Sequence, residues 1–394
     1  MKKILLLFTT FFFCFETFAT DNIEGIHFYK GTWAETVAKA KTEKKLIFID
    51  FYTQWCGPCM NMAIEVFTSP TVGYFYNSNF INAKIDAEVG EGKTLANKFG
   101  VRSYPTYLFI NPNTQEVVHR SGSTQTVNTF IFTGQCALNP NMRSFYMESE
   151  YAKGSTDRTL LKNYVRYAQS IYKRENAEAA FNKLINGGAK LTDPDIWVLF
   201  VDYIQGLSPY LQKVSDNYTA FCNLYGKSAV DEKLAKETMY GDKSRIAAMC
   251  DFAGKSFNLK MIEVDNLDRK KDYEALGKMI DELIADPTIN QNELCSRMKF
   301  IFRARSITEV PQAWAKKILE YIQYIAYNYE DRRDAYIHQE YAAALEAILR
   351  SVPADQWANY LPESVLKAPQ KGKQEYSMRP SMLKMKPTVS KYKK

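Results

Sequence analysis

The feature that most constrains this chain is the run Cys56-Gly57-Pro58-Cys59, in which two cysteines flank a pair of turn-forming residues. An apolar, strand-like run over 46–51 precedes it, and a helix-like segment follows it to about Phe67. A helix that begins at this motif would hold both thiols near its N-terminus, where backbone N–H groups and the helix dipole stabilise a thiolate. Such a pair can alternate between dithiol and disulfide with little movement of the backbone.

Strand-like and helix-like segments alternate over residues 20–140, which is the pattern of an α/β layer fold. Thr32 and Glu35 have the spacing of a capping box at the start of the first helix. The turn residues over 111–114 predict a hairpin between the last two strands. We expect strands over 26–29, 46–51, 80–86, 107–110 and 117–120, and helices over 32–44, 56–67, 72–77, 94–99 and 127–136.

The run over 50–59 resembles the thioredoxin family, in which a strand carrying a buried aspartate leads into the active-site helix. The downstream run Tyr104-Pro105-Thr106 matches the cis-proline loop of that family. Further matches over 65–72 and 79–86 are similar to exported thioredoxin-like proteins such as the C-terminal domain of DsbD-type electron transporters. The resemblance covers about residues 25–135 and implies an α/β thioredoxin fold, with a central mixed sheet flanked by helices.

Thiol–disulfide chemistry is the activity that this resemblance implies, with the Cys56–Cys59 disulfide as the redox group and no other cofactor. We expect Cys56 to be the nucleophile, because it is nearer the helix start, and Cys59 to resolve the mixed disulfide. Asp50 carries over as the buried carboxylate that accepts a proton from Cys59 through water, or else as a structural acid at the end of a strand. The expected substrate-binding residues lie beside the motif and in the cis-proline loop: Trp55, Gly57, Pro58, Tyr104, Pro105 and Thr106.

Two departures from the family pattern concern the surroundings of the motif. Asn82 stands where the family has a lysine near the carboxylate, and Lys84 follows two residues later on the same strand face. The active-site helix also lacks a kinking proline before Phe67. How Lys84 stands to Asp50, and therefore how the carboxylate handles its proton, is left open.

The remaining cysteines show no metal-ligand spacing, and the chain has only three histidines, so we predict no metal site. A CxxC pair can alternatively be half of a zinc site or a structural disulfide. The scattered cysteines have apolar helical neighbours and are expected to be free buried thiols, with a Cys222–Cys250 bridge as the alternative: they are Cys136, Cys222, Cys250 and Cys295.

Both ends of the chain differ from its body. Residues 1–19 have the charged start, apolar stretch and small-residue end of a secretory signal peptide, which implies an exported, periplasmic protein. Residues 367–394 hold nine Lys or Arg and one acid, which exceeds the net charge of +7 of the whole chain. The body is therefore not basic, and we predict a disordered basic tail and no nucleic-acid partner.

From 144 to 352 the apolar residues recur at spacings of three and four, which predicts an all-helical domain. Breaks such as 187–188 and 208–209 indicate helical hairpins that loosely resemble the tetratricopeptide type, with a compact bundle as the alternative. We expect this domain to offer a docking surface for partner proteins.

The sequence therefore predicts an exported oxidoreductase that reduces disulfides of envelope client proteins and receives electrons from a membrane thiol donor. The Gly-Pro pair of the motif is the one found in reducing thioredoxins, and no histidine lies near it. An isomerase or oxidase is the first alternative. A scaffold protein that uses the thioredoxin domain only for docking is the second.

Overall fold

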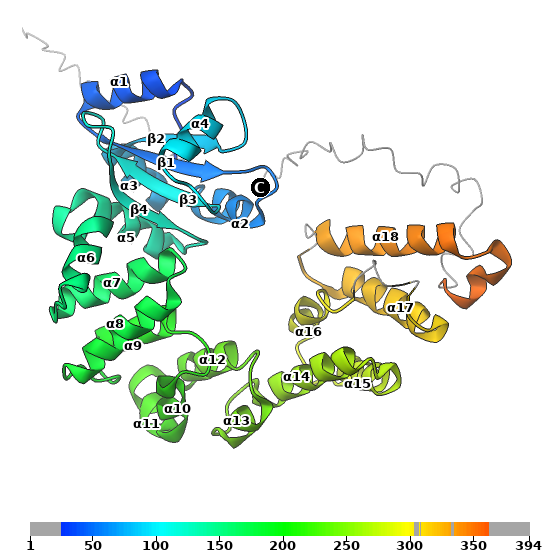
Figure 1. Cartoon of the computed structure of the whole chain (residues 1–394). Helices are drawn as coiled ribbons and strands as arrows, with labels where there is room; N and C mark the ends of the chain where they lie inside the picture. The colour runs from blue at the N-terminus through cyan, green and yellow to red at the C-terminus, as the bar shows by residue number, and fades with distance from the viewer. Residues whose placement is uncertain (1–24, 303–306, 308, 332–334, 362–394) are drawn as a thin grey trace, which may run out of the picture. The chain divides into compact units, whose positions relative to one another are not determined.

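The computed structural model describes residues 25–302, 307, 309–331 and 335–361. The predicted signal peptide and basic tail lie outside these residues. The chain divides into two compact units, and the boundary along the sequence falls between Gln205 and Gly206. All four strands lie in the first unit, and the second consists of helices (Figure 1).

The first unit contains a mixed four-stranded sheet, which confirms the predicted fold class. In spatial order its strands are β2 (Phe80–Asp86), β1 (Leu46–Tyr52), β3 (Thr106–Ile110) and β4 (Val117–Gly122). β1 pairs in parallel with β2 and antiparallel with β3, and β3 pairs antiparallel with β4 across the predicted hairpin. The central position of β1 buries it on both sides, as its continuous apolar run predicts.

Helices cover both faces of this sheet. On one face Ile47, Ile49 and Phe51 pack against α1 (Trp33–Glu43) and α4 (Glu91–Lys98). On the other face Phe48 belongs to an aromatic core that includes α3 (Pro70–Asn79) and α5 (Val127–Leu138). Thr32 and Glu35 form the predicted capping box at the start of α1.

The helix that follows the cysteine motif consists of α2 (Gly57–Asn61) and a π-helical segment, η1 (Met62–Val66). The widened turn lies in the stretch where the sequence lacks a kinking proline. Met62 is fully buried there, and its sulfur accepts the backbone N–H of Gln125 at 3.2 Å. The π segment therefore ties the active-site helix to the loop that precedes α5.

The strand expected over 26–29 does not form, and this prediction is wrong. Ile26 N–H donates to Phe67 O at 2.7 Å, whereas Tyr29 N–H donates to Asn82 O at 2.8 Å. Because the two backbone bonds go to different elements, the segment crosses from the active-site helix to β2 and has no continuous partner strand.

Helices α6 (Ser144–Ala152) and α7 (Arg158–Ser170) pack against β4, inside the first unit (Figure 1). Ser144 forms two bonds to the strand: its N–H donates to Nδ1 of His119 at 3.0 Å, and its hydroxyl accepts Arg120 N–H at 3.1 Å. Burial lowers the pKa of His119 to about 3, so the ring is neutral and free to accept this bond. After α7 come α8 (Arg174–Asn186) and α9 (Pro194–Tyr203), and η2 (Pro140–Met142) precedes α6.

The second unit is built of helices that pair with their sequence neighbours, among them α11 with α12, α14 with α15 and α17 with α18. Trp314, Leu276 and Ile318 belong to a core shared by the last five helices. Among the residues that are described, no helix has the length and hydropathy needed to cross a bilayer. The elements are α10 (Pro209–Asp216), α11 (Tyr218–Tyr225), α12 (Lys227–Glu237), α13 (Lys243–Ala248), α14 (Lys255–Lys270), α15 (Tyr273–Ala285), α16 (Gln291–Met298), α17 (Gln312–Asn328), α18 (Ala335–Ser351) and η4 (Ala354–Asn359).

Candidate active site

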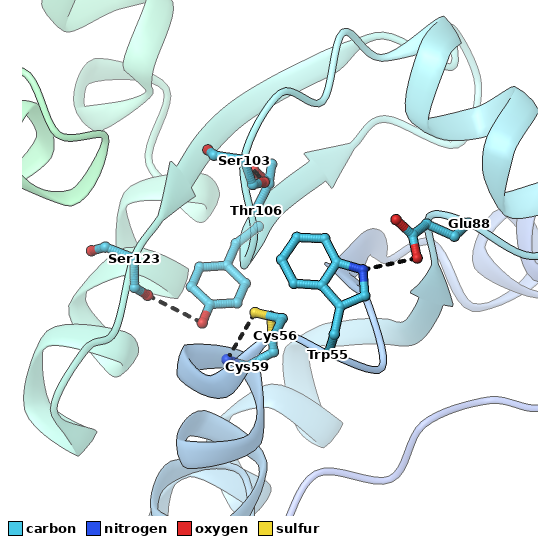
Figure 2. The surroundings of a disulfide bond; sticks show 8 residues. Trp55, Cys56, Cys59, Glu88, Ser103, Thr106 and Ser123 are labelled. Atoms are coloured by element: carbon cyan, nitrogen blue, oxygen red, sulfur yellow. Dashed lines mark hydrogen bonds between the residues drawn. A yellow bond between two sulfur atoms is a disulfide. The ribbon is translucent and has the colours of Figure 1, made fainter. Parts of the chain in front are cut away.

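The two cysteines of the motif are joined by a disulfide at the start of α2, between Trp55 and Ser123 (Figure 2). Cys56 occupies the N-cap position, and its sulfur accepts the backbone N–H of Cys59 at 3.1 Å. Pro58 lies in the first helical turn, where its missing N–H leaves no helical bond unmade. The helix start thus places a hydrogen-bond donor against the Cys56 sulfur, which would favour its thiolate after reduction.

An exposed aromatic residue stands beside the disulfide. Trp55 is 68% exposed, and its ring packs edge-on against Tyr104 with the centroids 6.0 Å apart. Its indole N–H donates to the carboxylate of Glu88 at 3.0 Å (Figure 2). The ring is therefore held in place although it remains open to solvent.

The Tyr104–Pro105 peptide bond is cis, as the resemblance implies. Pro105 is buried, and the hydroxyl of Thr106 donates to Ser103 O at 2.7 Å, which closes the loop before β3. Of the expected binding residues, Tyr104 and Pro105 lie directly before β3 and Thr106 is its first residue, whereas those of the motif follow β1. These two strands are adjacent, and the contact between Trp55 and Tyr104 joins the two groups.

Asp50 is 1% exposed, which confirms the expected buried carboxylate. Neither of its oxygens has a hydrogen-bond partner among the described residues. Burial raises the pKa of Asp50 to about 7, and the positive charge of Lys84 partly opposes this rise. A carboxyl group that titrates near neutrality can both accept and return a proton.

Lys84 is the register partner of Asp50 across the parallel pairing of β1 and β2. Side chains of paired residues point to the same sheet face, here the face that packs against the active-site helix. The Lys84 ammonium lies 4.7 Å from the ring centroid of Tyr52, and Phe28 and Phe67 lie within 6 Å. The structure thus resolves the question left open by the sequence, because Lys84 acts on the charge of Asp50.

A fully buried neighbour of Asp50, Tyr107, was not predicted from the sequence. Tyr107 lies opposite Asp50 on β3, and its hydroxyl donates to Ser123 O at 3.3 Å. Burial, followed by the charge of Asp50, raises the pKa of Tyr107 well above its ordinary value, so the phenol stays neutral. Glu88 was also missed, because strand registers and loop contacts have no local sequence signal.

The other cysteines described here are free thiols: Cys136, Cys222, Cys250 and Cys295. The Cys222–Cys250 bridge considered from the sequence does not form in this structure. Burial raises the pKa of Cys136 to about 12 and that of Cys295 to about 11, so both stay protonated. No cluster of three or more potential metal ligands occurs within the described ranges.

Comparison with known families places the similarity in the first part of the chain. A family model described as thioredoxin-like matches residues 28–112, and this match ends before α5 and all later helices. Thioredoxin-1 of Drosophila melanogaster is 38% identical over 71 residues, which make up 18% of this chain and 62% of that protein. Thioredoxin H4 of Arabidopsis thaliana is 35% identical over 78 residues, which make up 20% of this chain and 61% of that protein.

The chain thus spans about three-fifths of the length of these curated relatives. The solution structure of a candidate disulphide-isomerase from Bacteroides thetaiotaomicron is 37% identical to it, with a TM-score of 0.28. That likeness covers 29% of this chain and 95% of the other. Strand β4 and every later element lie outside the residues matched by the family model.

Proposed function

Because residues 28–112 form a thioredoxin-like domain, we propose that this chain is a thiol–disulfide oxidoreductase whose redox group is the Cys56–Cys59 pair. The observation that carries the proposal is the placement of that pair. The disulfide starts a helix and lies beside an exposed tryptophan whose ring contacts the cis-proline loop. It is preceded on β1 by the buried carboxyl of Asp50, on the sheet face that packs against the active-site helix.

In the first step the Cys56 thiolate attacks one sulfur of a client disulfide, where client means a protein on which the enzyme acts. A mixed disulfide forms between Cys56 and the client, and the second client sulfur leaves as a thiolate that takes up a proton. The N–H of Cys59 supports the charge of the Cys56 thiolate. Trp55, Gly57 and Pro58 border the attacked sulfur, together with the loop of Tyr104, Pro105 and Thr106.

In the second step Cys59 resolves the mixed disulfide. Asp50 accepts the proton of the Cys59 thiol, and the resulting thiolate attacks the sulfur of Cys56. The Cys56–Cys59 disulfide forms and the bond from Cys56 to the client breaks. The client sulfur leaves as a thiolate that takes up a proton, so two electrons have passed from the enzyme to the client. A dithiol donor must then reduce the pair, and the donor that we propose is a membrane thiol protein.

A trapping experiment tests this chemistry. The Cys59→Ser variant should accumulate mixed disulfides with client proteins through Cys56, and the double variant with Cys56→Ser should accumulate none. A non-reducing gel followed by mass spectrometry identifies the trapped species. If the reduced wild-type protein does not reduce any protein or peptide disulfide, the proposed activity is wrong.

We propose that the natural direction is reduction of client disulfides. The Gly57-Pro58 pair and the absence of a histidine beside the second cysteine support this direction. Equilibration in dithiothreitol and glutathione buffers should give a reduction potential of about −270 mV. A value above about −200 mV would instead identify an oxidase or isomerase.

Export to the periplasm is part of the proposal and rests on the predicted signal peptide over 1–19. The mature N-terminus should be residue 20, and mass spectrometry of the protein from an envelope fraction measures it. Retention of residues 1–19 on a protein found only with the cytoplasmic fraction would contradict export.

The second unit is proposed as a docking surface for partner proteins. Its helices α15 and α17 border a hollow of about 730 Å³, where Tyr273 and Trp314 stack at 5.2 Å. If the chain were only a scaffold, Cys56→Ser would leave its cellular function unchanged. For an enzyme, the same variant should lose function while partner binding persists, and co-purification with partners separates the two outcomes.

A further inference from the structure

Helix α7 ends against the loop on which a client polypeptide is proposed to bind. A Cβ atom added to Gly122 would lie 3.0 Å from Pro105 O and 3.4 Å from Ser170 O. Gly122, the last residue of β4, therefore lies against both the cis-proline loop and the last turn of α7. The hydroxyls of Ser121 and Ser170 are hydrogen-bonded at 2.9 Å and fix this contact.

A cavity of about 340 Å³ lies at this junction. It is lined by Arg102, Ser103 and Thr106 from the cis-proline loop, and by Tyr172 and Lys173 from the turn between α7 and α8. Strand β4, helix α6, the last turn of α7 and Ile171 supply the rest of the lining, which includes the carboxylate of Glu148 on α6. Because Thr106 directly follows Pro105, the cavity adjoins the cis-proline loop, which contacts Trp55 of the motif through Tyr104.

The charge of this cavity is positive. Neither Arg102 nor Arg120 takes part in any ion pair among the described residues, and the Arg120 guanidinium donates only to backbone carbonyls, at Phe99 and Gly100. Lys173 is paired with Glu148 at 3.4 Å. Two cationic side chains are therefore left without a carboxylate, which favours an acidic ligand.

Tyr172 at the rim of the cavity has an unusual backbone. It follows the last turn of α7 with φ 61°, and its side chain is 53% exposed. This left-handed position after a helix usually carries glycine, and a side chain there costs roughly 1 kcal/mol. Because the ring is half open to solvent, its packing in this structure offers little compensation for that cost, and strain of this kind often marks a functional position.

We propose that this cavity is a subsite for an acidic side chain of the client polypeptide, one or two residues from the client cysteine that bonds to Cys56. Arg102 supplies the charge, and Tyr172 supplies an aromatic wall for the client backbone. The proposal rests on the proposed function and adds a client preference to it. The helical layer thereby takes part in client selection, because α7 and α8 hold Tyr172 in place.

The test compares two peptide disulfides that differ only in Glu or Gln two residues from the attacked cysteine. Reduced full-length mature protein is mixed with each peptide, and the rate constant for peptide reduction is measured. The Glu peptide should react about threefold to fivefold faster, the size of a partly exposed ion pair. This advantage should shrink as the salt concentration rises.

Two variants connect the preference to the cavity. Arg102→Gln should abolish the advantage of the Glu peptide, so that the ratio of the two rate constants falls to about one. Lys41→Gln is the control. It removes an equal charge from α1, which packs on β1 and β2 and not on β4, and the Glu peptide should keep its advantage. Tyr172→Gly should slow both peptides while thermal stability stays equal or rises, which excludes unfolding as the cause.

The outcomes distinguish the two proposals. If both peptides are reduced at the same rate, or if Arg102→Gln keeps the preference, the subsite is wrong and the oxidoreductase proposal stands. If neither peptide is reduced, the proposed function fails and the subsite fails with it.

Discussion

Lys84 lies directly opposite Asp50 in the parallel pairing of β2 with β1, on the sheet face that carries the active-site helix. The cation opposes the effect of burial on the pKa of Asp50. It is held among aromatic rings, with Tyr52 at 4.7 Å. Lys84 therefore acts on the reaction through Asp50: its charge lowers the pKa of the carboxyl group that is proposed to take the proton of Cys59.

Replacing Lys84 should change the pH dependence of the resolving step. In Lys84→Met the pKa of Asp50 should rise further, because the opposing positive charge is lost. The carboxylate form needed as a base would then appear at higher pH. Rapid-mixing measurement of Cys59 attack across pH 6–9 should show a profile displaced upward, and Lys84→Arg should restore it; equal profiles would contradict the coupling.

Asp50 should also lower the stability of the oxidised protein as the pH rises to neutrality. Its pKa of about 7 in the folded chain exceeds the ordinary value of 3.8, so the unfolded chain loses this proton first. Stability is therefore lost as pH rises from about 4 to 7, by up to about 4 kcal/mol for this group. Asp50→Asn should be more stable than wild type at pH 8, and the difference should vanish near pH 4.

Calorimetry of the oxidised protein at both pH values measures this effect. Glu65→Gln, an exposed carboxylate on η1, is the matched control and should change neither value by more than about 0.5 kcal/mol. An Asp50→Asn variant that is less stable than wild type at pH 8 would show that the carboxylate makes favourable native contacts.

His119 should make the contact between α6 and β4 sensitive to acid. Its folded pKa of about 3 lies below the ordinary 6.5, so the unfolded chain binds the proton more strongly. Stability is fully present above pH 6.5 and falls by up to about 1.4 kcal/mol per pH unit toward pH 3. His119→Gln, which can still accept the Ser144 N–H, should weaken this slope in urea unfolding between pH 6.5 and 4.

Gly122→Ala should disturb both neighbours of that residue. The new methyl group would lie 3.0 Å from Pro105 O, and the backbone must shift to admit it. We expect a loss of about 1–3 kcal/mol in stability and slower client reduction. Two other glycines do not serve as controls for this variant. Gly154 has a positive φ, so alanine there would be strained, and Gly57 has open space around it but belongs to the cysteine motif.

Thiol accessibility should separate the cysteines of the oxidised protein. Cys136 and Cys295 are buried, and their raised pKa values keep them protonated. At pH 8 iodoacetamide should modify them at least tenfold more slowly than after unfolding, as peptide mapping by mass spectrometry would show. Rapid modification of either thiol in the native protein would mean that its surroundings open readily.

The sequence predicted those parts of the fold that are encoded locally. The capping box of Thr32 and Glu35, the apolar run of β1 and the turn residues of the β3–β4 hairpin act over a few neighbours, and each was read correctly. The segment over 26–29 failed because its pattern is strand-like but its partners lie on two different elements.

The missed parts of the site depend on contacts between distant residues. Nothing in the sequence fixes the register that sets Lys84 and Tyr107 beside Asp50. The π segment has no proline to mark it, and the hydroxyl contact of Ser121 with Ser170 joins residues 49 positions apart. Small polar residues of this kind are also typical of solvated loops, so their burial could not be predicted.

The bond between Ser121 and Ser170 has a practical consequence for dissecting the chain. Gln125 donates to the Ser121 hydroxyl at 2.8 Å and accepts from Thr133 at 2.9 Å, so a buried polar relay runs from α7 to α5. A recombinant fragment that stops at residue 140 lacks Ser144 and Ser170. The hydroxyl of Ser121 and the imidazole of His119 would then lose these partners and be exposed to water. A fragment that continues to Gln205 keeps both sealed and is the better choice for isotope labelling and crystallisation.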